Sequence, residues 1–116
     1  MEKRINYKEK PKTFEFLGDG TYYYNYDIQQ ILIEQENEES IYEWSCIQVM
    51  LYGQPSYQDC VKAIIRVFVP QEDEFKLVNN YNSYVLGIGE EVSKENYISY
   101  LNLLKEIKTK VKADFE

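Results

Sequence analysis

The chain has 116 residues, of which 44% are hydrophobic, and it carries a formal net charge of −7 at pH 7. This length suits one domain, and the hydrophobic content exceeds that of disordered acidic chains. No apolar stretch approaches the ~20 residues that span a bilayer, and no apolar segment typical of a secretory signal follows the first residues. We therefore expect a soluble, cytoplasmic protein that makes no membrane contact.

The charge is unevenly distributed along the chain. Residues 1–12 hold five basic and two acidic side chains, a net charge of +3, whereas residues 13–93 hold three basic and fourteen acidic ones, a net charge of −11. Nucleic-acid affinity depends largely on Lys and Arg side chains that neutralise phosphates, so we expect no nucleic-acid partner. Residues 1–11 are expected to form a flexible basic arm, followed by a single α+β domain over residues 12–116.

The first half of the domain has the pattern of β-strands. Apolar and polar residues alternate before a Gly-Asp-Gly turn, and a stretch rich in Tyr and Ile follows it. A three-residue loop, Gly18 to Gly20, would place Phe16 opposite Tyr22. An acidic hairpin loop then leads into a third strand, which completes an antiparallel meander. The three strands are expected at about 12–17, 21–34 and 41–52.

The second half shows apolar side chains at spacings of three and four residues, which is typical of helices. Pro70 is expected to end the first helix and open the second, Gly87 and Gly89 to end the second, and Ser93 to cap the third. Strands followed by helices favour an α+β fold with the helices packed on one face of the sheet. The three helices are expected at about 56–69, 71–86 and 94–113.

The pairing of the second and third strands decides which side chains face the helices. With the connecting loop at residues 36–39, Tyr24 is expected opposite Leu51. Tyr22, Tyr24 and Tyr26 then point toward the helices, because alternate side chains of a strand share a face.

The same register gathers apolar side chains on the opposite, solvent-facing side of the sheet, with Ile31 beside Trp44 and Ile33 beside Tyr42. Exposed apolar patches tend to mark interaction surfaces, and Trp and Tyr are frequent anchors in them. Two interpretations stay open. These four residues form an interface with a protein partner or a second copy, or the basic arm or a helix covers them.

The sequence offers little for catalysis. It contains no histidine, which removes the commonest general base and the nucleophile arrangements that depend on it. Acidic residues cluster in loops and in first helical turns, where solvation and the helix dipole explain them. Cys46 and Cys60 lack metal-ligand spacing and are expected to be buried free thiols. We therefore expect no catalytic residues, no metal and no cofactor, and a protein that is not an enzyme.

The stretch from Trp44 to Tyr84 carries a resemblance. It comprises most of YEWSCIQV and then GQPSYQDCVKAIIRVFVPQEDEFKLVNNYNSY, and it resembles small uncharacterised proteins of gut bacteria and their prophages. None of its motifs is a catalytic signature. The resemblance implies a phage- or mobile-element-associated accessory protein, linked to tail or virion assembly, and it assigns no functional residues.

Two functions fit these observations. The leading hypothesis is a non-enzymatic protein-interaction or assembly module that binds a protein partner or forms a homo-oligomer. The alternative is a small-ligand or carbohydrate-binding domain that stacks its ligand on Tyr22, Tyr24 and Tyr26, which requires those rings to be exposed in a concavity.

Overall fold

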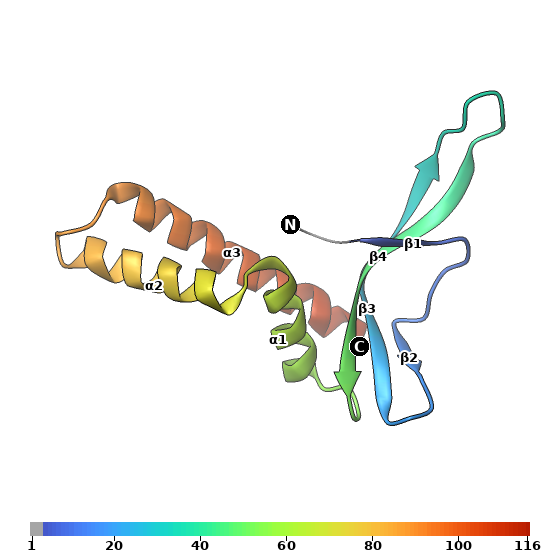
Figure 1. The fold of residues 1–116 in the computed structure, drawn as a ribbon, viewed down its shortest axis with the longest axis horizontal. Helices are drawn as coiled ribbons and strands as arrows, with labels where there is room; N and C mark the ends of the chain where they lie inside the picture. Colours follow the sequence, from blue (N-terminus) through green and yellow to red (C-terminus); the bar gives the residue numbers. More distant parts are fainter. Residues whose placement is uncertain (1–3) are drawn as a thin grey trace.

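A computed structural model describes residues 4–116 as an α+β fold (Figure 1). In this described part of the chain, four strands form one antiparallel sheet in the order β1-β4-β3-β2. The strands are β1 (Ile5–Tyr7), β2 (Phe14–Phe16), β3 (Thr21–Ile33) and β4 (Ile41–Tyr52). The helices are α1 (Tyr57–Phe68), α2 (Gln71–Val85) and α3 (Glu91–Asp114).

The sheet has one strand more than the predicted three, because part of the predicted basic arm pairs with β4. Tyr7 of β1 lies opposite Trp44, and Ile5 lies opposite Cys46. Three residues are too few to show a strand period in the sequence, since alternation needs at least four. Residues 1–3 of the predicted arm lie outside the described residues.

The first hairpin confirms the predicted register. Phe16 lies opposite Tyr22, and Phe14 opposite Tyr24. The turn between β2 and β3 depends on Gly20, whose φ of 85° lies in the left-handed region that glycine adopts without strain. The ring of Phe14 stacks on Tyr24 at 5.1 Å between centroids, so the pairing joins two apolar side chains on the helix-facing side.

The predicted register of the second hairpin is wrong by two residues over residues 21–26 of β3. Tyr22, rather than Tyr24, lies opposite Leu51, and Tyr26 lies opposite Ile47. A shift of two residues leaves every side chain on its original face. Tyr24 and Tyr26 are therefore buried as predicted, although their partners differ.

A β-bulge interrupts β3 between Tyr26 and Gln29, and Asp27 adopts a positive φ of 55° there. The Asp27 carboxylate accepts a hydrogen bond from Gln29 at 2.9 Å and forms ion pairs with Arg4 at 3.2 Å and Lys110 at 3.4 Å. Burial opposes ionisation, but the Gln29 hydrogen bond and the two cations outweigh it and lower the pKa of Asp27. The bulge thus joins the N-terminal segment, β3 and α3.

The hydrophobic core lies between the sheet, α1 and the C-terminal part of α3. At its edge the Tyr24 hydroxyl donates a hydrogen bond to Asp114 at 2.5 Å, which ties the end of α3 to β3. Burial and this bond both raise the pKa of Tyr24. The core residues are Tyr24, Tyr26, Ile47, Leu51, Cys60, Val61, Ile64, Ile107 and Val111.

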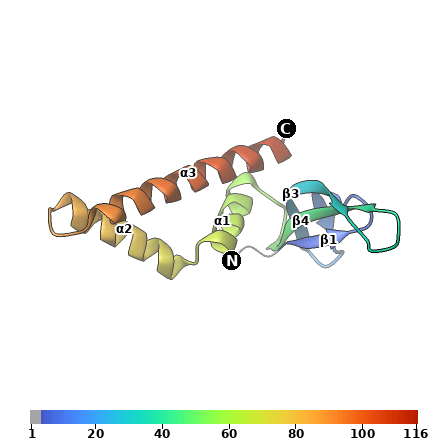
Figure 2. The same ribbon diagram turned by 90° about the horizontal axis from the view of Figure 1, so that it is seen from above.

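The helices do not all pack on the sheet, contrary to the prediction. Figures 1 and 2 show α2 lying antiparallel to the N-terminal half of α3, with both projecting beyond the sheet. No residue of α2 is buried. The radius of gyration is 18.0 Å, whereas a compact chain of this length would have about 13 Å. The molecule therefore consists of a sheet, the helix α1 packed against it, and a projecting α2–α3 hairpin.

Candidate functional site

The four residues predicted as a partner interface do not form one patch. Ile31 lies opposite Glu43, while Trp44 lies opposite Gln30. Opposed residues share a face of the sheet and neighbours along a strand do not. Ile31 and Ile33 therefore lie on one face of the β3–β4 ribbon, and Tyr42 and Trp44 on the other. The extra residue of the bulge causes the split, because it reverses every β3 side chain beyond it.

The N-terminal segment lies against the Trp44 face. Lys10 places its ammonium 5.3 Å from the centre of the Trp44 ring, at a distance typical of a cation–π contact. Further along this face, the Nε2 atom of Gln48 donates to the Tyr7 hydroxyl at 2.6 Å and to Asn25 at 2.9 Å. Trp44 is consequently half-buried, and Tyr42 beyond it is exposed.

The tyrosines of the ligand-stacking alternative do not line a concavity. Tyr24 and Tyr26 are buried in the core. Tyr22 is half-buried and packs against Phe16, with 5.0 Å between ring centroids. Stacking on a sugar requires an open ring face, so this conformation offers none on Tyr24 or Tyr26.

Groups that could act as nucleophiles or metal ligands are not assembled in the described region. Both cysteines are buried and free, as predicted. Burial raises the pKa of Cys60 to about 12, so its thiol stays protonated at neutral pH and is a poor nucleophile. Within residues 4–116, no group of three or more Cys, Asp or Glu side chains could hold a metal ion.

The most exposed aliphatic side chains described lie at the tip of the α2–α3 hairpin. Leu86 is 75% exposed and Ile88 is 79% exposed, and Val85 and Val92 beside them are also exposed. We call these four residues the apolar tip. This surface was not predicted from the sequence. Its signal would have been Ile88, an apolar residue between two glycines, because the turn is formed by the glycines and does not need an apolar side chain there.

The geometry of the turn places the apolar tip in solvent. The Ile88 N–H donates to the Ser83 carbonyl at 3.0 Å, and the Gly87 N–H donates to the Tyr84 carbonyl at 3.0 Å. Together with a φ of 82° at Gly87, these bonds form a Schellman motif. In that motif the residue at the Ile88 position commonly packs back on its own helix, but here it points outward.

A seam of tyrosines holds the hairpin together. Tyr81 of α2 stacks on Tyr97 of α3 with 4.4 Å between ring centroids. Nearer the sheet, Glu74 accepts hydrogen bonds from Arg66 at 3.1 Å and from the Tyr100 hydroxyl. These two bonds lower the pKa of Glu74, so the carboxylate stays charged at neutral pH. These contacts fix α2 against α3, so the apolar tip stands at the end of an ordered hairpin.

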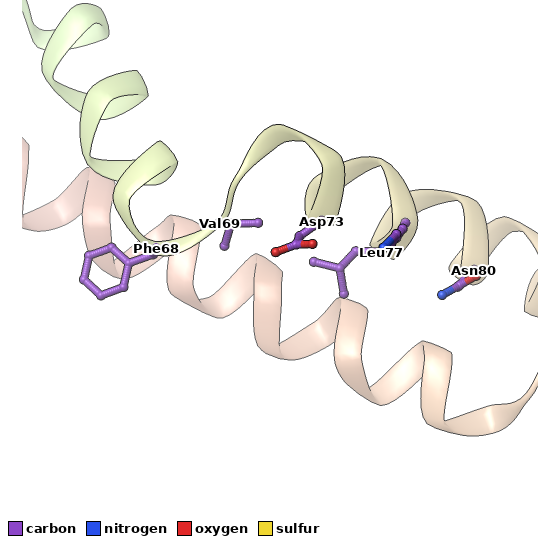
Figure 3. Close-up of a pocket in the computed structure, with 6 residues that line it drawn as sticks. Phe68, Val69, Asp73, Leu77 and Asn80 are labelled. Carbon is purple, nitrogen blue, oxygen red and sulfur yellow. The ribbon is translucent and has the colours of Figure 1, made fainter. Parts of the chain in front are cut away.

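A shallow cavity of about 310 Å³ opens where α1 passes into α2. Figure 3 shows Phe68 and Val69 at its α1 end and Asp73, Leu77 and Asn80 along one side of α2. The cavity mixes apolar walls with single charges and brings no pair of acids together, so it has no evident chemistry. Its lining residues are Phe68, Val69, Asp73, Lys76, Leu77 and Asn80.

Comparison with protein-family models, with curated proteins and with solved structures finds no match to this chain. None of the helices described for residues 4–116 is both long enough and apolar enough to cross a membrane.

Proposed function

We propose that this protein is a non-enzymatic protein-interaction module and that the α2–α3 hairpin is its docking element. One observation carries the proposal: the two most exposed aliphatic side chains described, Leu86 and Ile88, stand at the end of a helical hairpin that projects from the core. Exposed apolar side chains gathered at one place are characteristic of surfaces that bind other proteins. The hairpin supplies a support that is already ordered, which reduces the entropy lost on binding.

The charges beside the tip favour a protein over a membrane or a nucleic acid. Glu90 and Glu91 lie two and three residues after Ile88 and are exposed. Carboxylates are repelled by phosphates and by anionic lipid surfaces. A partner that accepts the tip should therefore combine an apolar pocket with basic groups at its rim.

The biological setting belongs to the same proposal. The resemblance over Trp44 to Tyr84 supports an accessory role in a phage or another mobile element, with assembly of a tail or virion as the process. In that role the protein acts in the cytoplasm, and its partner is a larger protein assembly or a further copy of the chain.

Site-specific photo-cross-linking at the tip tests the proposal. A benzophenone amino acid replaces Ile88 in cells that naturally contain the protein, and adducts are identified by mass spectrometry after irradiation. We expect a defined polypeptide adduct at position 88, because the side chain would be covered in the bound state. The matched control carries the same group at Tyr52, which is 83% exposed but lies at the end of the sheet.

A defined adduct from position 88 that position 52 does not give supports docking through the tip. Equal labelling from both positions, or no polypeptide adduct from position 88, would contradict it.

A further inference from the structure

One side of α3 is open along its length. Figure 2 shows α1 and α2 on the same side of α3, which leaves the other side free of helices. Ile98 is 46% exposed and Leu101 is 44% exposed. Residues three and four positions apart lie on one face of a helix, and this spacing continues in both directions from the two apolar side chains. The resulting stripe comprises Glu91, Lys94, Ile98, Leu101, Lys105, Lys108 and Lys112, and its last two lysines border α1 at Tyr57.

The stripe has opposite charges at its two ends. Glu91 stands at the end near the apolar tip, where Glu90 and Glu95 lie close in the sequence and the three acids outnumber Lys94, whereas the other end carries three lysines at positions 105, 108 and 112. A surface that is acidic at one end and basic at the other is complementary to itself when a second copy packs in the reverse direction. Two-fold dimers are built from such self-complementary surfaces.

We propose that the partner of the docking element is a second copy of this chain, packed antiparallel along α3 around a two-fold axis between Ile98 and Leu101. This inference rests on the proposed function and names its partner. Ile98 of each copy then meets Leu101 of the other, and Glu91 of each copy meets Lys108 of the other. Each contact occurs twice, as two-fold symmetry requires.

The same arrangement gives the apolar tip a receiving surface. Tyr57 lines two shallow cavities of about 320 and 440 Å³ at the C-terminal end of α3. Val61 and Phe115 contribute apolar walls, and Lys108 and Lys112 lie at the edge. An apolar groove bordered by lysines is the surface expected to accept an apolar tip that is followed by glutamates. In an antiparallel pair, the tip of one copy lies beside this groove of the other.

One pair in this arrangement has like charges, because Lys94 of each copy approaches Lys105 of the other. The Lys94 ammonium, however, lies 6.0 Å from the centre of the Tyr84 ring, on its own hairpin. Glu95, the next residue, offers Lys105 a charge of the opposite sign. Glu95 and the two Glu91–Lys108 contacts therefore offset the two Lys94–Lys105 contacts.

Charge exchange between positions 91 and 108 tests the pairing, because these residues cannot meet within one molecule. They are 17 positions apart on one helix, which is about 26 Å at ~1.5 Å per residue. Sedimentation velocity over a concentration series should show a reversible wild-type dimer. Glu91→Lys and Lys108→Glu should each weaken it roughly tenfold, since two attractive contacts become repulsive.

The double variant Glu91→Lys/Lys108→Glu should restore the dimer, and an equimolar mixture of the two single variants should form a heterodimer. Lys76→Glu makes the same charge change on α2, outside the stripe, and should leave dimerisation unchanged. Circular dichroism and thermal unfolding of every variant establish that the fold is retained, which is expected because Glu91 and Lys108 are both exposed.

A wild-type protein that stays monomeric at its highest soluble concentration would overturn the inference, as would a dimer that the single variants do not weaken. Single-variant losses that neither the double variant nor the mixture restores would overturn the assigned pairing. A different result would contradict the proposed function, namely the absence of a defined adduct from position 88. A monomer whose position 88 cross-links to another protein would refute the dimer and keep the docking element.

Discussion

Ile107→Ala is expected to lower the free energy of unfolding by about 3 kcal/mol, within the range for removing a large aliphatic side chain from a well-packed core. Ile107 is fully buried and belongs to the core that joins α1, α3 and the sheet. The substitution leaves a cavity between these elements that rigid neighbours cannot fill. Urea unfolding followed by circular dichroism measures the loss.

The matched control is Ile98→Ala, the same change nine residues earlier on α3 at a half-exposed position. It should cost less than about 1 kcal/mol at a concentration where the protein is monomeric. The reason is that the half-exposed Ile98 side chain buries much less apolar surface than Ile107 does. Equal losses from the two variants would show that α3 does not present the Ile107 face to the core.

Gly89→Ala is expected to destabilise the α2–α3 hairpin by roughly 2 kcal/mol, as overpacking against fixed atoms typically does. A Cβ atom at position 89 would lie 2.6 Å from the Tyr84 nitrogen and 2.9 Å from the Ser83 carbonyl carbon. Both are backbone atoms within the Schellman motif, so the turn must open. Hydrogen exchange should become faster in α2 and remain unchanged in β3 and β4.

Gly87→Ala provides the control, because its cost has a different cause. A Cβ atom there meets nothing within 4 Å, but the φ of 82° disfavours any side chain, which costs about 1 kcal/mol. The Gly89 variant should be the more destabilised of the two. A Gly89→Ala protein with wild-type exchange in α2 would show that the turn is not closed against Tyr84.

The order of elements could be predicted from the sequence because each has a strong local pattern. Alternation of side chains defined β3 and β4, and Pro70 separated α1 from α2. The start of α3 was less well defined. The helix begins at Glu91 rather than after Ser93, because the compact Gly87 to Gly89 turn leaves few residues between the helices.

The register of β3 on β4 could not be predicted, and the reason is physical. Two-residue shifts preserve the faces of a strand, so hydrophobic alternation cannot distinguish them. A bulge at Asp27 has no apolar signature either, because it depends on contacts with Arg4 and Lys110 that are distant in the sequence. The predicted Ile31–Trp44 patch failed for this reason.

The projection of the hairpin was hidden for a related reason. An apolar face on α2 has the same periodicity whether the helix packs on a sheet or on another helix. In this fold it faces α3 through Tyr81 and Tyr97, so the apolar tip stands clear of the core. Periodicity predicts that a helix has an apolar face, but it does not predict which other element that face packs against.

Small-angle X-ray scattering of the monomer tests the central claim, that the helical hairpin projects from the sheet and leaves its apolar tip open. The Glu91→Lys variant at low concentration keeps the sample monomeric for this measurement. We predict a radius of gyration near the 18.0 Å of the structure. A value near the ~13 Å of a compact chain of this length would mean that the hairpin folds back on the sheet, and it would contradict the account.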